Sequence, residues 1–136
     1  MHSIQVDHGR ALLDVRLSGF FDEAQAWRAI EDVRDAVRSL GPRAGQHVTL
    51  YDVSAIDVAP APTIELLKRS YVDPAIRHLW ARRVAYVSPT ALGRIQMRRL
   101  REARGDIGVF DSRQAALAWL LAERDTAPAP DAGMLE

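Results

Sequence analysis

The stretch of residues 47–64, HVTLYDVSAIDVAPAPTI, constrains the fold of this chain more than any other. Residues 48–53 mix apolar side chains with threonine and tyrosine, which is typical of a strand covered on both faces. A short turn follows, and the prolines before Thr63 predict that a helix begins there. A buried strand that leads through a turn into a helix is typical of open α/β sheets, whose ligand sites lie at such turns.

Strand and helix patterns alternate along the rest of the chain. Residues 4–6 and 11–17 are joined by an Asp-x-Gly turn and predict an antiparallel hairpin. Short apolar runs at residues 84–87 and 107–110 predict two more strands, with segments of helical periodicity between the strands. The expected order is β-β-α-β-α-β-α-β-α. This order predicts one α/β domain, in which helices pack on a mostly parallel sheet of four to five strands with an N-terminal antiparallel hairpin.

Composition limits the classes of protein to which this chain can belong. Its 136 residues, 48% of them hydrophobic, suffice for one domain with its own core. It has no cysteine, which excludes disulfides, thiolate zinc sites and a cysteine nucleophile. The 18 basic and 18 acidic residues balance, so we expect no nucleic-acid partner. No apolar run resembles a signal peptide or approaches the ~18 residues of a membrane span, and we therefore expect a cytoplasmic protein that is not an integral membrane protein.

We expect the domain to occupy residues 1–124 and the tail, residues 125–136, to be disordered. The tail reads DTAPAPDAGMLE and lacks the periodic apolar residues that a packed element needs. The hairpin at the other end of the chain leaves an exposed edge strand, which is compatible with a homodimer.

The element order and two motifs resemble the STAS domain, the fold of anti-sigma-factor antagonists. The segment Asp52-Val53-Ser54-Ala55-Ile56 resembles the family's strand-ending motif, in which aspartate and serine stand two apart before a turn and a helix. The C-terminal VFDS and AALAWL segments resemble the ending of the SpoIIAA-like branch, which is also compared with CRAL-TRIO lipid-binding domains. The resemblance covers residues 4–123 and implies a non-catalytic regulatory or protein-binding domain.

One position departs from that family. Antagonists of the family carry a phosphorylated serine at the start of the helix after the central strand. Counted from Asp52, this position falls on Ala61 or Pro62, which have no hydroxyl group, and Thr63 stands one or two positions later. The resemblance therefore implies a domain that lacks the family's phosphorylation switch.

The turn after the central strand and the helix start are the first candidate site for a partner or ligand. Thr63 could carry a phosphate near a helix N-terminus. The structural alternative is that Ser54 ends the strand and Thr63 caps the helix, which explains both residues. Asp52 and Asp57 could form a carboxylate pair, but no further metal ligands accompany them, and turn aspartates that bind backbone amides explain them. The residues of this candidate site are Asp52, Ser54, Asp57, Ala61, Thr63 and Ile64.

The helix expected over residues 90–103 is the second candidate site. At about 100° per residue, one face holds an arginine stripe with a methionine beside it, which can bind a phosphate headgroup, an acidic protein surface or nucleic acid. A solvated helix face is the plain alternative. The stripe consists of Arg94, Met97, Arg98 and Arg101. The opposite face, expected to pack on the sheet, consists of Leu92, Ile95, Leu100 and Ala103.

No catalytic or metal-binding pattern is present in the sequence. The histidines, His2, His8, His47 and His78, are scattered and none has metal-ligand spacing. A Ser-His-Asp triad assembles only in space, but the Gly-x-Ser-x-Gly motif of hydrolases is missing. We expect no enzymatic activity, no metal and no cofactor.

Two functions remain. The first is capture of a protein partner by the turn at residues 56–63 and the helix after it. The alternative is a carrier or sensor that holds a small hydrophobic or anionic, lipid-like ligand between the sheet and the helices of residues 62–80, with a lid-like movement at the Asp73-Pro74 break. Trp27, Trp80 and Trp119 either line such a pocket or pack in the core.

Overall fold

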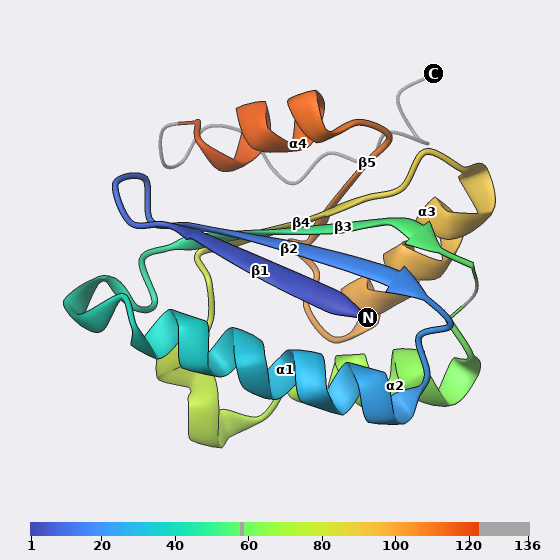
Figure 1. Ribbon diagram of the computed structural model, residues 1–136, viewed down its shortest axis with the longest axis horizontal. Coiled ribbons are helices and arrows are strands. Elements are labelled where there is room, and N and C mark those ends of the chain that lie inside the picture. The colour runs from blue at the N-terminus through green and yellow to red at the C-terminus, as the bar shows by residue number, and fades with distance from the viewer. Residues whose placement is uncertain (58, 123–136) are drawn as a thin grey trace.

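One mixed sheet forms the centre of the computed structural model, which describes residues 1–57 and 59–122 (Figure 1). Within these residues the strands are β1 (His2–Asp7), β2 (Leu12–Gly19), β3 (Val48–Ile56), β4 (Arg83–Val87) and β5 (Gly108–Phe110). They lie side by side in chain order; β1 pairs antiparallel with β2, and every other pair is parallel. The predicted α/β class, element order and N-terminal hairpin are thus confirmed. The tail expected over residues 125–136 lies outside the described residues.

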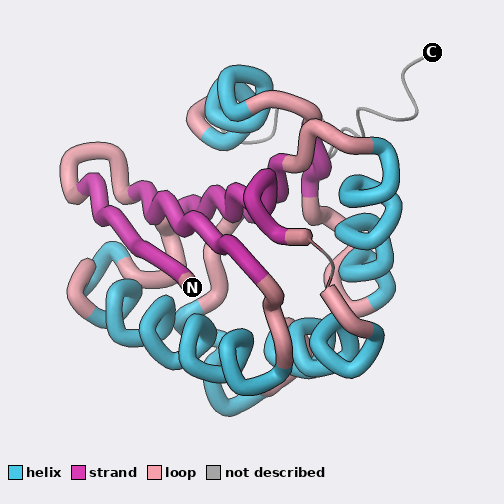
Figure 2. Tube along the Cα trace, turned by 45° about the vertical axis from the view of Figure 1, so that its right-hand side comes forward, coloured by secondary structure: helices cyan, strands magenta, loops and turns pink. Residues whose placement is uncertain are grey.

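Helices cover both faces of the sheet (Figures 1 and 2). They are α1 (Glu23–Arg38), α2 (Ala61–Ser70), α3 (Ala91–Arg98) and α4 (Arg113–Leu120), with the 3₁₀ helices η1 (Gly41–Arg43), η2 (Pro74–Leu79) and η3 (Arg99–Glu102). α1, α2 and η2 lie on one face, which we call the lower face, and α4 is the only described helix on the upper face, where it lies over β3, β4 and β5. None of these helices is long and apolar enough to cross a membrane.

Strand alternation divides the core into two layers. Successive side chains of a strand point to opposite faces, so Leu13, Val15 and Leu17 of β2 enter the lower core. Leu50 of β3 enters the upper core, which Leu120 of α4 closes. The lower core also receives polar side chains from the central strands, namely Thr49, Tyr51 and Tyr86. These inward-facing polar groups mark the part of the core where a site can form.

The predicted break at Asp73-Pro74 is present, and η2 follows it. The Asp73 carboxylate accepts a hydrogen bond from the Ala75 N–H at 3.0 Å and so caps η2. The loop before β3 lies against the C-terminal end of η2. Gly45 has a φ of +89°, and a Cβ atom there would stand 2.9 Å from the His78 carbonyl oxygen. Only glycine combines that backbone conformation with such a close approach.

Candidate functional site

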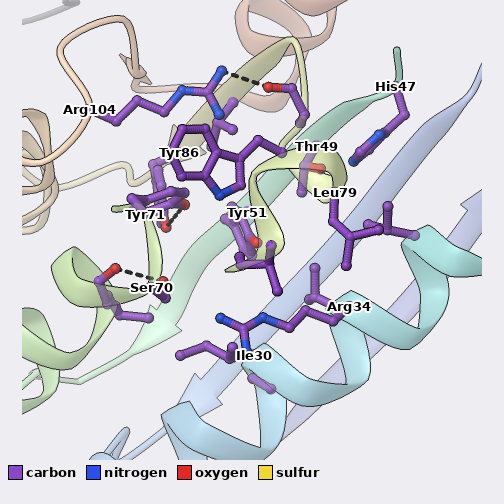
Figure 3. Close-up of a pocket in the computed structure, with 18 of the residues that line it drawn as sticks. Ile30, Arg34, His47, Thr49, Tyr51, Ser70, Tyr71, Leu79, Tyr86 and Arg104 are labelled. Carbon is purple, nitrogen blue, oxygen red and sulfur yellow. Dashed lines mark hydrogen bonds between the residues drawn. The ribbon is translucent and has the colours of Figure 1, made fainter. Parts of the chain in front are cut away.

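A cavity lies between the lower face of the sheet and the helices α1, α2 and η2 (Figure 3). Its volume is about 80 Å³. Apolar side chains such as Val33, Leu67 and Leu79 form most of its wall, while Thr49 of β3 faces it from the sheet. β3 and β4 supply the floor, and η2 closes the cavity on the side where the chain passes from α2 to β4.

All three tyrosines of the chain meet at this cavity. The rings of Tyr51 and Tyr86 stack, with centroids 4.8 Å apart and an interplanar angle of 16°. The hydroxyl groups of Tyr71 and Tyr86 form a hydrogen bond of 2.6 Å. Burial raises the pKa of each tyrosine well above its usual value of 10.0. The cluster therefore presents neutral hydroxyl groups, which can donate and accept hydrogen bonds.

His47 is a buried, neutral member of the cavity wall. Its side chain sits at the start of β3 and is 1% exposed. Burial, together with the charge of Arg104, lowers its pKa from 6.5 to about 4. Its Nδ1 accepts a hydrogen bond from the Gly45 N–H at 3.1 Å, so the ring proton lies on Nε2. His47 is therefore a hydrogen-bond donor at physiological pH.

Two arginines also line the cavity. Arg34 of α1 lies 3.8 Å from the Asp73 carboxylate. Arg104, which follows η3, donates to Asp106 at 2.7 Å and to the Ala81 carbonyl oxygen at 2.6 Å. The described residues around the cavity include no aspartate or glutamate, so its wall carries two guanidinium groups whose carboxylate partners, Asp73 and Asp106, are not among the lining residues.

Two N–H groups at this cavity have no hydrogen-bond partner among the described residues. They are Nη1 of Arg104 and Nε1 of Trp80, and both are buried. A buried polar group without a partner costs about 1–3 kcal/mol, and such groups are rare in native proteins. The cavity thus offers donors in excess of acceptors.

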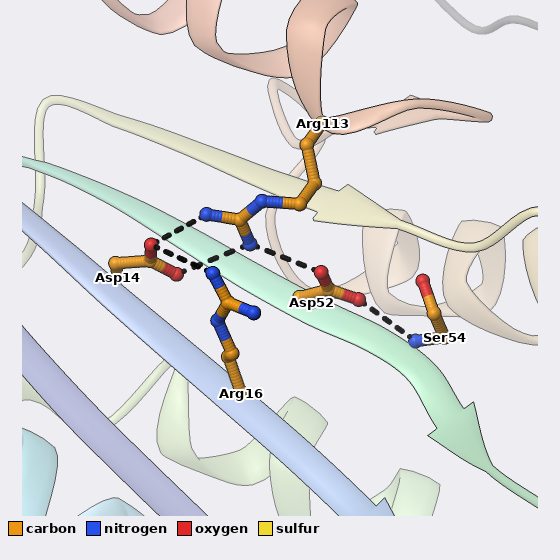
Figure 4. A network of polar contacts seen from close by, with 5 residues as sticks. All are labelled: Asp14, Arg16, Asp52, Ser54 and Arg113. Carbon is orange, nitrogen blue, oxygen red and sulfur yellow. Dashed lines mark hydrogen bonds and ion pairs between the residues drawn. The ribbon is translucent and has the colours of Figure 1, made fainter.

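The structure brings together only some of the residues that the sequence predicts to form a site at the end of β3. The Asp52 carboxylate accepts hydrogen bonds from the Ser54 N–H and from Arg113 of α4, both at 3.0 Å (Figure 4). Arg113 also binds the Asp14 carboxylate of β2, at 2.5 Å, so it ties α4 to two strands. Burial raises the pKa of Asp52, but the bonds from Ser54 and Arg113 outweigh burial and hold the pKa below its usual value. Asp57 is exposed and takes no part in this network.

The start of α2 presents only part of the surface that the sequence predicted. Ala61 is exposed, as a contact residue must be. Ile64 is fully buried, and so is Thr63, whose hydroxyl donates to the Phe21 carbonyl oxygen at 3.0 Å. Thr63 is therefore not a helix cap; α2 begins after Pro60, and Thr63 fixes α2 to the end of β2. A kinase could reach its hydroxyl only if this part of the core opened.

The predicted orientation of the arginine-rich helix is wrong. Met97 is 4% exposed and belongs to the core, whereas Leu92 and Ile95 are 62% and 53% exposed. Arg94 donates to the Ser88 carbonyl oxygen at 3.1 Å and Arg101 to that of Ile107 at 2.7 Å, so the stripe faces the sheet. The helix is also shorter than predicted, since α3 ends at Arg98, a half-buried residue, and continues as η3. The expected anion-binding face is thus turned inward, while Leu100 is buried as predicted.

Because α3 faces the core with its arginine stripe, its other apolar residues form an exposed surface at the carboxyl ends of the strands. A groove of about 430 Å³ separates the end of β3 from the start of α3, with Ser54, Ile56 and Asp57 on one side and Leu92 on the other. Phe20, which follows the neighbouring strand β2, is 60% exposed. We call the exposed apolar residues of α3, Leu92 and Ile95, the carboxyl-edge patch.

The tryptophans have different roles. Trp80 lines the cavity, and Trp119 packs on Phe110 with ring centroids 5.6 Å apart. Trp27 is 47% exposed, so the expectation that it joins either the core or a pocket is wrong. The inner side of α1 instead carries the small residues Ala26 and Ala29, which let the helix approach the sheet.

Sequence reasoning missed most residues of the cavity. Its polar members come from segments far apart in the chain, and none belongs to a local motif. One signal was available: Thr49 and Tyr51 alternate on β3 with the apolar Val48 and Leu50, which indicates polar groups on a buried face.

The described residues contain no group of three acidic, histidine or cysteine side chains that could hold a metal ion. A comparison of the chain with models of known protein families and with curated proteins finds no match.

Proposed function

We propose that this chain is a non-catalytic, STAS-like binding domain that holds a small molecule in the cavity between the sheet and α1, α2 and η2. The observation that carries the proposal is the pair of buried, unpartnered N–H groups of Trp80 and Arg104 at that cavity. A bound molecule with acceptor atoms can supply the partner that each of these groups lacks among the described residues. The cavity also coincides with the place where the sequence predicted a ligand, between the sheet and residues 62–80.

The STAS assignment rests on the resemblance of the sequence and is compatible with the fold. The motif from Asp52 to Ile56 ends the central strand, as it does in that family. Ala61 and Pro62 stand at the helix start where the family has its phosphorylated serine, so regulation by a ligand takes the place of regulation by a kinase in this proposal.

Native mass spectrometry of protein purified directly from cells tests the proposal. We expect a reproducible extra mass on the wild-type chain. A Val33→Phe variant places a larger side chain in the cavity wall and should lose the extra mass while it keeps its circular dichroism spectrum. A Val72→Phe variant, at an exposed position, is the matched control and should retain it. If the wild type carries no extra mass and its melting temperature does not respond to any small solute, the proposal is wrong.

A protein partner is the second candidate function, and the carboxyl-edge patch favours it. Exposed apolar residues beside a groove are typical of an interaction surface, and the groove lies where parallel sheets place their sites. Partner capture by the Leu92→Glu/Ile95→Glu variant should fail, whereas Val72→Glu, at a similarly exposed position that follows α2, should bind normally. Equal capture by both variants would exclude this surface.

A further inference from the structure

The polar groups of the cavity include more free hydrogen-bond donors than acceptors. Nη1 of Arg104 and Nε1 of Trp80 are donors that lack a partner within the described part of the chain, and neutral His47 adds the donor Nε2. The tyrosine hydroxyls can adapt to either role, but Tyr71 and Tyr86 already bind each other. A molecule that matches this wall must supply acceptor oxygens and needs few donors.

The positive charge of Arg104 favours an anionic acceptor over a neutral one. Arg104 acts on its surroundings, since its charge contributes to the lowered pKa of His47 and opposes the rise in the pKa of Tyr51. Its carboxylate partner Asp106 is 61% exposed, and so is outside the cavity. The guanidinium group donates to the carbonyl oxygen of Ala81, the neighbour of Trp80, which brings it to the end of η2. An anionic oxygen placed there gains a charge-assisted hydrogen bond from Arg104, which is about twice as strong as a neutral one.

The size of the cavity limits the rest of the molecule. An engineered core cavity of about 150 Å³ admits benzene, so a volume of about 80 Å³ has room for a smaller molecule, of roughly three to five non-hydrogen atoms. The wall away from the donors is apolar and includes Ile30, Val33 and Leu67. The occupant therefore combines one small anionic group with a short apolar part.

We infer that the cavity binds a short-chain monocarboxylate of acetate or propionate size, with its carboxylate on Arg104 and Trp80 and its alkyl chain toward α1 and α2. This inference rests on the proposed function, because it names the class of ligand for the same cavity. A long-chain fatty acid exceeds the volume of the cavity, and a neutral molecule of the same size gains no charge-assisted hydrogen bond from Arg104.

A chain-length series tests the inference. Sodium acetate, propionate, butyrate and octanoate, with propionamide as the neutral analogue of propionate, are titrated into the full-length protein and followed by amide NMR shifts. We expect acetate or propionate to bind best and to shift the amides of residues 76–81, and we expect propionate to bind at least tenfold more tightly than propionamide. Octanoate should bind more weakly than butyrate.

Two variants examine the donors separately. Trp80→Phe keeps an aromatic ring and removes the Nε1–H, and should weaken propionate binding severalfold. Arg104→Gln removes the charge and should weaken it at least tenfold, whereas Arg38→Gln, an exposed position at the end of α1, should leave it unchanged. Because Arg104 also binds Ala81 and Asp106, the melting temperature of Arg104→Gln is measured beside its affinity, and Trp80→Phe remains a test if that variant unfolds.

The outcomes separate the inference from the proposed function. If propionamide binds as well as propionate, if octanoate binds best, or if neither donor variant weakens binding, the carboxylate assignment is wrong while ligand binding stands. If none of these solutes binds, and neither benzene nor xenon enters the cavity, the proposed function fails too.

Discussion

The hydroxyl groups of Tyr71 and Tyr86 lie 2.6 Å apart and join the end of α2 to β4 across the cavity. Each ring is largely removed from water, and Tyr86 stacks on Tyr51 of the neighbouring strand. This contact brings the helical wall and the sheet floor of the cavity together through a polar bond. The stability of the cavity therefore depends on a hydrogen bond as well as on apolar packing.

Tyr71→Phe and Tyr86→Phe should each destabilise the fold by about 1–2 kcal/mol, because each leaves the other hydroxyl without its partner. The double variant should lose less than the sum of the two, since no hydroxyl is then left unpaired. Urea unfolding of the four proteins measures the coupling. Strictly additive losses would mean that the bond contributes nothing to stability.

Alkaline titration should find the tyrosines protonated in the folded protein at a pH where free tyrosine ionises. Burial raises the pKa of all three above 10.0, so the folded state holds protons that the unfolded state releases. The contribution of the three tyrosines to the free energy of unfolding is therefore complete below pH 10 and decreases as the pH rises above that value. Tyrosinate absorbance should appear together with the loss of circular dichroism, and its appearance in folded protein near pH 10 would contradict this prediction.

His47 should make the domain sensitive to mild acid. Its pKa of about 4 in the folded state lies below the usual 6.5, so between these values the unfolded chain binds a proton that the folded chain does not. The contribution of His47 to the free energy of unfolding is therefore complete above pH 6.5. It should decrease as the pH falls toward 4, by up to about 3 kcal/mol. A His47→Gln variant should lack this pH dependence. An identical profile in both proteins would exclude His47 as its source.

Arg113→Met should loosen α4. The arginine binds Asp14 and Asp52 from a position that is 30% exposed, so its loss should cost about 1–2 kcal/mol and leave each carboxylate with a weaker partner, the Ser54 N–H for Asp52 and Arg16 for Asp14. Arg16→Met is the matched control, because Arg16 is 59% exposed and 3.9 Å from the same Asp14 carboxylate. Hydrogen exchange of α4 should rise only in the first variant. Equal exchange in both would show that packing alone holds the helix.

The fold was predictable because its signals are local. A hairpin turn, alternating strands and the break at Asp73-Pro74 each depend on a few neighbouring residues, and together they fix the element order. The orientation of α3 was not predictable from its apolar residues alone. Arg94 and Arg101 bind the carbonyl oxygens of Ser88, which follows β4, and Ile107, which precedes β5. Met97 lies between the two arginines on the same face, so Leu92 and Ile95 point outward.

The cavity could not be read from the sequence for a different reason. Arg34, His47, Tyr71 and Arg104 belong to four separate segments, and their convergence depends on how α1 and η2 pack on the sheet. Sequence patterns show which face of an element is apolar, but they do not show where two apolar faces fail to fill the space between them. The candidate residues of the β3 turn and of α3 were named from such patterns, and the structure places several of them in structural roles, as Thr63 and Asp52 illustrate.

The same cavity gives the domain a mechanical property. Its volume of about 80 Å³ corresponds to about 50 mL per mole, and the decrease in volume on unfolding scales with such internal space. Hydrostatic compression therefore favours the unfolded chain, and the weakest part of the molecule under pressure is the layer between η2 and the sheet. A molecule that occupies the void reduces this volume difference, so a filled domain should withstand higher pressure than an empty one.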